Sequence, residues 1–66
     1  MIKIFGSETC GQCKILLKKF KDKNINFEYV IDEEELRKNN IRGLPTLIIE
    51  DKVYNYYQAV QYINGV

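Results

Sequence analysis

The spacing of apolar residues changes from a strand period to a helix period within the first 24 positions. Ile2 and Ile4 flank a polar residue, and this alternation predicts a short strand over 1–5. After a break at 6–7, apolar residues recur at the i, i+3, i+4, i+7 spacing of one helix face: Cys13, Leu16, Leu17 and Phe20. We therefore predict an amphipathic helix that ends near Asn24, with lysines on its opposite face.

A second strand and a second helix follow. Apolar and polar residues alternate over 25–31, which predicts a strand with one well-buried face. Asp32 is a suitable N-cap, and Glu35 is the acid that would complete a capping box. We expect a short helix from there to about Asn39.

The last third of the chain predicts a hairpin and a final helix. The continuous apolar run at 46–49 is typical of a strand covered on both faces, and hence of a central one. A tight turn at 50–52, a return strand at 53–55 and a helix at 57–64 complete the order βαβαββα. The sequence therefore predicts one α/β domain over 1–66, with a mixed four-stranded sheet and helices on both faces.

Composition and charge exclude several classes of function. The chain has 66 residues and a net charge of +1, which gives no reason to expect a nucleic acid or a membrane as partner. No apolar run approaches the roughly 18 residues of a membrane span, and the start lacks the apolar region of a secretory signal. We expect a cytoplasmic monomer, in a compartment where disulfides are usually transient and catalytic.

The two cysteines are the strongest candidates for chemistry. Cys10 falls at the N-cap or first position of the predicted helix, where free N–H groups and the helix dipole favour a thiolate. Lys14 adds a positive charge that would favour the thiolate further. Cys13 lies one turn in, on the apolar face, and is suited to resolve a mixed disulfide on Cys10. The small ring would contribute only about 2 kcal/mol to stability, so the pair is a poor structural staple.

Metal binding is the main alternative from another class. Two thiolates at a helix start suit Cu(I) or Zn(II), and ETCGQC resembles the site of small ferredoxin-like copper chaperones. Those proteins have two consecutive strands after the first helix, whereas here an acid-capped helix at 32–39 follows a single strand. A closed zinc site would also need ligands from a second chain. We therefore expect no bound metal or cofactor, only a reversible Cys10–Cys13 disulfide. A non-catalytic scaffold with this fold is a third possible function.

Two motifs resemble the thioredoxins. Cys-Gly-Gln-Cys-Lys at 10–14 is similar to their Cys-Gly-x-Cys-Lys, and Arg-Gly-Leu-Pro-Thr at 42–46 is similar to their Arg-Gly-x-Pro-Thr. The chain starts directly at the strand before the cysteines, as glutaredoxins do, so it resembles a minimal, glutaredoxin-sized member of the thioredoxin-like superfamily. The resemblance implies that Pro45 is cis and lies against the cysteines, and that the backbone of Leu44 binds the substrate chain.

The resemblance also implies a substrate groove and a set of partners. The groove residues carried over are Thr9, Gly11, Gln12, Gly43, Leu44 and Pro45. Asn55 and Tyr56 replace two glycines that help glutaredoxins bind glutathione, and the acids of that motif are absent. We therefore expect a protein-disulfide reductase recycled by a thioredoxin-reductase-like flavoenzyme, with a glutathione-dependent glutaredoxin as the alternative. Ribonucleotide reductase is one client that the resemblance implies.

One departure concerns the resolving step. Thioredoxins have a buried Asp six residues before the first cysteine, which accepts a proton, and Ile4 replaces it here. Resolution by Cys13 must therefore use water, Lys14 or another group, or proceed without a dedicated base.

Overall fold

A computed structural model describes residues 2–65, and its helices and strands follow the predicted order. They are β1 (Ile2–Phe5), α1 (Gly11–Asp22), β2 (Glu28–Val30), α2 (Glu33–Lys38), β3 (Thr46–Ile49), β4 (Lys52–Tyr54) and α3 (Tyr56–Asn64). The strands form one mixed sheet in the order β2-β1-β3-β4. β1 pairs in parallel with β2 and antiparallel with β3, and β3 pairs antiparallel with β4. The prediction of a mixed four-stranded α/β fold is confirmed.

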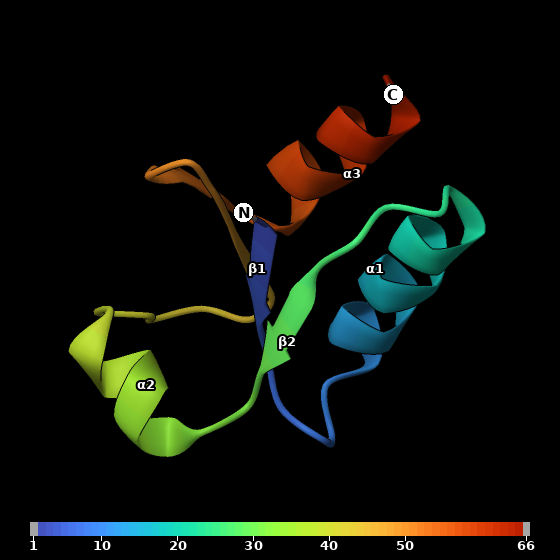
Figure 1. Ribbon diagram of the computed structural model, residues 1–66. Helices are drawn as coiled ribbons and strands as arrows, with labels where there is room; N and C mark the ends of the chain where they lie inside the picture. The colour runs from blue at the N-terminus through green and yellow to red at the C-terminus, as the bar shows by residue number, and fades with distance from the viewer. Residues whose placement is uncertain (1, 66) are drawn as a thin grey trace.

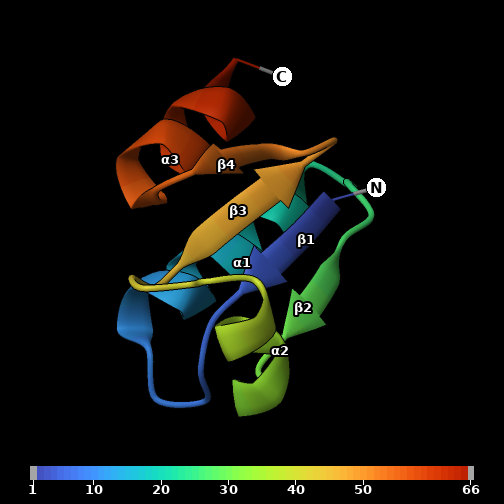
Figure 2. The ribbon, with the colours of Figure 1, turned by 90° about the vertical axis from the view of Figure 1, so that its left-hand side faces the viewer.

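Helices cover both faces of the sheet. Figure 1 shows α1 and α3 on one face and α2 on the other, and the turned view in Figure 2 agrees. α1 and α3 also contact each other. The two central strands therefore lie between helical layers, as the apolar run of β3 predicts. Half of each strand is fully buried and the other half partly buried.

The core lies between the sheet and the α1–α3 layer. Its fully buried members are Ile4, Leu16, Phe20, Leu47, Ala59 and Ile63. The ring of Phe20 also packs edge-on against Phe27, with ring centroids 5.8 Å apart, and stacks on Tyr62 at 6.5 Å. Phe5 points to the opposite face, where it lies beside Ile48 and the end of α2.

The first two helices end in the same C-capping motif, each with an asparagine in the left-handed region. Asn24 and Asn40 both have φ of 56°, and each follows the C-cap residue of its helix. The N–H of Asn24 donates to Lys21 and that of Ile25 to Phe20, which is the Schellman pattern. Asn tolerates the left-handed region better than most residues because its short polar side chain bonds locally.

Local polar groups also determine the remaining chain reversals. Glu50 and Asp51, the two residues between the paired ends of β3 and β4, have φ of 46° and 70°, as a type I′ hairpin turn requires. At the start of α3, Asn55 and Gln58 form a reciprocal capping box. The carboxylate of Asp32 caps α2 through the N–H of Glu34, at 3.0 Å, and the structure does not show the capping box that we expected with Glu35.

The predicted strand over 25–31 is wrong in its length. β2 contains only the three residues that pair with β1, which ends at Phe5. Ile25 is unavailable for a ladder because its N–H closes the end of α1, and Ile31 lies beyond the ladder with 40% of its surface exposed. An edge strand extends only as far as its single partner. The bounds of β4 and α3 differ from the prediction by one residue.

Adjacent positions in α1 offer a direct test of this packing. Leu16 is fully buried, whereas its neighbour Ile15 is 48% exposed. We expect Leu16→Ala to lower the free energy of unfolding by about 2–5 kcal/mol, because it leaves a cavity in the core. Ile15→Ala should change it by less than about 1 kcal/mol, since the lost contacts are offset by the better helix propensity of Ala. Urea denaturation followed by circular dichroism measures both; equal losses would contradict the packing described.

Candidate active site

The disulfide between Cys10 and Cys13 lies at the N-terminus of α1. Cys10 is the N-cap, and its sulfur accepts a hydrogen bond from the Cys13 backbone N–H at 3.1 Å. The two Cα atoms are 5.2 Å apart. The predicted N-cap position of Cys10 is therefore confirmed. The first N–H groups of a helix have no partner within the helix, and the positive end of the helix dipole lies at the same place. Both favour a negatively charged sulfur at Cys10, so the position suits a thiolate.

The two sulfur-bearing residues differ in their access to solvent. Cys10 is partly exposed, whereas Cys13 is fully buried on the core face of α1. An incoming disulfide can therefore reach Cys10 first. Cys13 faces the interior, where only its bonded partner and the residues packed on it lie within reach.

Gly6, just after β1, fits tightly against the buried side of the disulfide. A Cβ atom placed on Gly6 would lie 2.7 Å from the Cys13 Sγ and 2.7 Å from the Tyr29 hydroxyl oxygen. Real Cβ atoms do not approach other atoms so closely, so any side chain at position 6 would displace both groups. The absence of a side chain at Gly6 therefore allows α1 and β2 to meet at this point.

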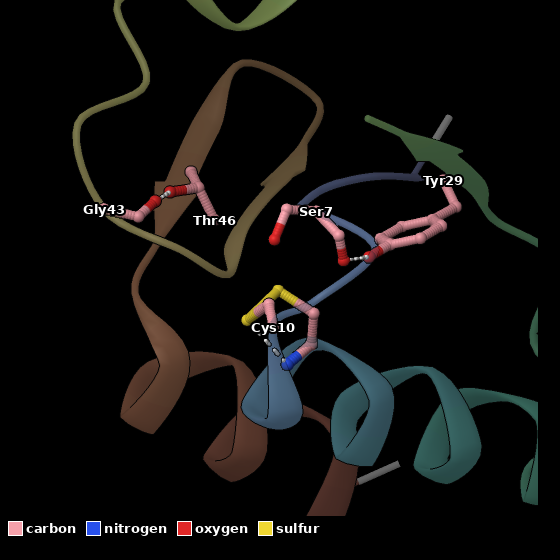
Figure 3. Close-up of a disulfide and its surroundings, with 6 residues drawn as sticks. Ser7, Cys10, Tyr29, Gly43 and Thr46 are labelled. Atoms are coloured by element: carbon pink, nitrogen blue, oxygen red, sulfur yellow. Dashed lines mark hydrogen bonds between the residues drawn. A yellow bond between two sulfur atoms is a disulfide. The ribbon is translucent and has the colours of Figure 1, made fainter. Parts of the chain in front are cut away.

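Tyr29 connects β2 to the loop that leads into the cysteines. Its hydroxyl donates a hydrogen bond to the Ser7 carbonyl at 2.8 Å, and Figure 3 shows it pointing toward this loop. The Cys10 N–H also donates to the Ser7 carbonyl, more weakly, at 3.5 Å. Burial, and then the nearby Glu8 carboxylate, raise the pKa of Tyr29 above its ordinary value of 10.0. The phenol is therefore neutral at physiological pH, and it can donate a hydrogen bond.

The loop before β3 is brought to the same end of the sheet. Phe5 pairs with Thr46 in the antiparallel ladder, so one step further the register places Pro45 opposite Gly6. The Leu44–Pro45 peptide bond is cis, as the resemblance implied. The Thr46 hydroxyl donates to the Gly43 carbonyl at 2.6 Å and orders this turn. In Figure 3 the disulfide lies between the first turn of α1 and this loop.

The remaining candidate residues surround the pair with small or polar surface. Thr9, Gly11, Gln12 and the lysine at 14 are exposed on the first turn of α1 and the loop before it. Gly43 and Leu44 are exposed, whereas Pro45 is buried. A shallow groove of about 350 Å³ runs from the loop to the start of α3, lined by Gly43, Leu44, Pro45, Thr46, Val53, Tyr54, Asn55, Tyr56 and Tyr57.

Sequence reasoning missed several of these residues. It identified the loop side of the groove but not the side formed by β4 and α3, because that side depends on how the hairpin folds back. It assigned no role to Gly6 beyond ending a strand, and it recognised Tyr29 only as an apolar position. The one available signal was a glycine directly after the first strand, four residues before the first cysteine.

No known protein-family model matches the sequence, and neither does any curated protein. Within residues 2–65, no cluster of three or more His, Cys, Asp or Glu side chains is arranged to hold a metal ion. No helix in this part of the chain has the length and apolar character needed to cross a membrane.

Gly6 and Gly11 form a matched pair for testing the packing at the disulfide. We expect Gly6→Ala to lower the free energy of unfolding by about 1–3 kcal/mol, because the new methyl group overlaps Cys13 and Tyr29. Gly11→Ala should leave stability unchanged or raise it by up to about 1 kcal/mol, since its Cβ would meet nothing within 4 Å in a helix. Thermal and urea unfolding of the oxidised proteins measure both; a harmless Gly6→Ala would disprove the tight contact.

Proposed function

We propose that this protein is a thiol:disulfide oxidoreductase of the thioredoxin-like class, which reduces protein disulfides through Cys10 and Cys13. The observation that supports this most directly is the asymmetry of the pair: a partly exposed sulfur held at a helix N-terminus and a buried sulfur bonded to it. A structural disulfide needs no such asymmetry. Nucleophilic attack followed by internal resolution does.

The proposed reaction has two steps. The Cys10 thiolate attacks a client disulfide, forms a mixed disulfide, and releases the first client thiolate. Cys13 then loses its proton and attacks the Cys10 sulfur, which forms the Cys10–Cys13 disulfide and releases the second client thiolate. Both client sulfurs leave reduced, and the protein pair is oxidised by two electrons.

The groove beside the loop is suited to an extended client chain. It is shallow and open, and it combines backbone groups at Gly43–Pro45 with exposed aromatic surface, of which Tyr57 is 74% exposed. The backbone of Leu44 would pair with the client, and Thr9, Gly11 and Gln12 would border the attacked disulfide. At the start of α3, Gln58 and Ala59 stand where the glutathione-binding motif of glutaredoxins has its acids, so that anchor for glutathione is missing. This supports recycling by a flavin-dependent reductase.

Single cysteine variants separate the two roles. With a disulfide-bonded client protein, Cys13→Ser should accumulate a mixed disulfide through Cys10, because nothing resolves it. Cys10→Ser should lose client reduction altogether, since the buried thiol cannot reach the client. Intact mass spectrometry under non-reducing conditions detects the adduct. Adducts of equal yield on both single variants would contradict the assigned order.

A redox titration tests the proposed function itself. Incubation in dithiol buffers of graded potential, followed by thiol trapping and intact mass, should show a reversible two-electron couple at about −270 mV or below. Such a potential fits a reductant of protein disulfides. A parallel assay compares recycling by a flavin-dependent thioredoxin reductase with recycling by glutathione. Absence of any reversible couple would reject the oxidoreductase function and favour a metal carrier.

A further inference from the structure

We propose that the Tyr29 hydroxyl donates a hydrogen bond to the Cys13 thiolate in the resolving step, and so promotes attack on the mixed disulfide. The inference rests on the proposed function, and it assigns the group that assists the buried sulfur. In this role Tyr29 acts on a reacting atom, from a strand that contributes no cysteine.

The geometry limits how far apart the two atoms can be. The Tyr29 oxygen and the Cys13 Sγ each lie 2.7 Å from the same point, the Cβ position above Gly6, so they are within twice that distance of one another. In the disulfide form the hydroxyl donates to the Ser7 carbonyl at 2.8 Å. When the disulfide opens, the Cys13 sulfur is released from Cys10. The proposal requires that this sulfur and the Tyr29 oxygen then approach to hydrogen-bond distance, as the O–H turns away from the Ser7 carbonyl.

The buried position of Cys13 makes such a donor valuable. A thiolate removed from water is costly unless it accepts hydrogen bonds, and Cys13 is fully buried. The ladder partner of Tyr29 on β1 offers no polar group, because it is Ile4, which packs in the core. A neutral phenol donates a hydrogen bond without itself accepting a proton. The Cys13 proton therefore leaves with the released thiolate or to water, and the disulfide exchange balances without an added base.

Tyr29→Phe removes the hydroxyl and keeps the ring, which allows a two-step kinetic test. The reduced protein is mixed with a chromogenic aromatic disulfide, dithiobis-nitrobenzoate. Attack by Cys10 releases one coloured thiolate, and resolution by Cys13 releases the second. Tyr62→Phe is the matched control, because this ring stacks on Phe20 in the core and its hydroxyl is unrelated to the cysteines.

At neutral pH we expect Tyr29→Phe to leave the first release unchanged and to slow the second by about four- to fifteenfold. Two opposing effects set this factor. A hydrogen bond to the charged sulfur increases the fraction of Cys13 that is thiolate, but a stabilised thiolate is a weaker nucleophile. At alkaline pH, where a thiol ionises without help from a hydrogen-bond donor, the variant should resolve as fast as the wild type or faster. The charged groups of the neighbouring segments are the same in both proteins. They are Glu8 on the loop, which acts on Tyr29, Lys14 on α1, and the Lys3–Glu28 pair of β1 and β2. Strand alternation puts that pair on the other face of the sheet from Tyr29.

Each outcome distinguishes the two proposals. If the wild type releases no coloured thiolate, the proposed function fails. If both steps occur and Tyr29→Phe resolves at the wild-type rate at neutral pH, the role of Tyr29 is rejected and the function stands. If the variant is slower by the same factor at every pH, or in both steps, Tyr29 only supports the packing and the inference is wrong.

Discussion

The contact between the Gly6 backbone and the Cys13 sulfur determines the arrangement of the rest of the site. Because position 6 has no side chain, the first turn of α1 lies directly on the end of β1. That close approach places Cys10 beyond the end of strand β1, where it caps the helix and remains partly exposed. The same end of β1 pairs with the start of β3, so the Pro45 loop lies at the same end of the sheet as the disulfide. One close contact and one strand pairing therefore bring three chain segments to this end of the sheet.

The stability of such a small domain comes from its core and from local chain reversals rather than from the disulfide. A chain of this size buries only about 60% of its unfolded surface, and here six residues form the fully buried core cluster. Two Schellman endings, a two-residue hairpin turn and a capping box supply specific backbone bonds at the points where the chain turns. Because a ring closed by Cys10 and Cys13 would add only about 2 kcal/mol, the fold does not depend on it. We therefore expect the domain to stay folded when the pair is reduced, as the proposed function requires.

The features that could be predicted from the sequence are those that depend on local periodicity. The apolar stripe of α1, its cysteine N-cap and the continuous run of β3 are all properties of neighbouring residues, and all three are confirmed. The length of β2 could not be predicted, because it depends on where its partner β1 ends. The place of Tyr29 also depends on a strand register, since the alternation of 25–31 shows only that its side chain faces inward. The sequence predicts the hairpin between β3 and β4, but the α3 side of the groove depends on how β4 and α3 pack beside the loop before β3, which no local pattern specifies.

The pairing of Ile4 with Tyr29 suggests how a minimal domain can combine an apolar core with a polar group near its buried thiol. A carboxylate at position 4 would be fully buried, and removing such a charge from water costs several kcal/mol. That cost is comparable to the total stability of many small domains, about 5–15 kcal/mol. Ile4 instead joins the core cluster, and a neutral hydroxyl reaches the same end of the sheet from the neighbouring strand. A phenol bonded to a backbone carbonyl is far cheaper to bury than an ion. In the proposed mechanism, this arrangement gives up a dedicated base and retains a hydrogen-bond donor for the resolving sulfur.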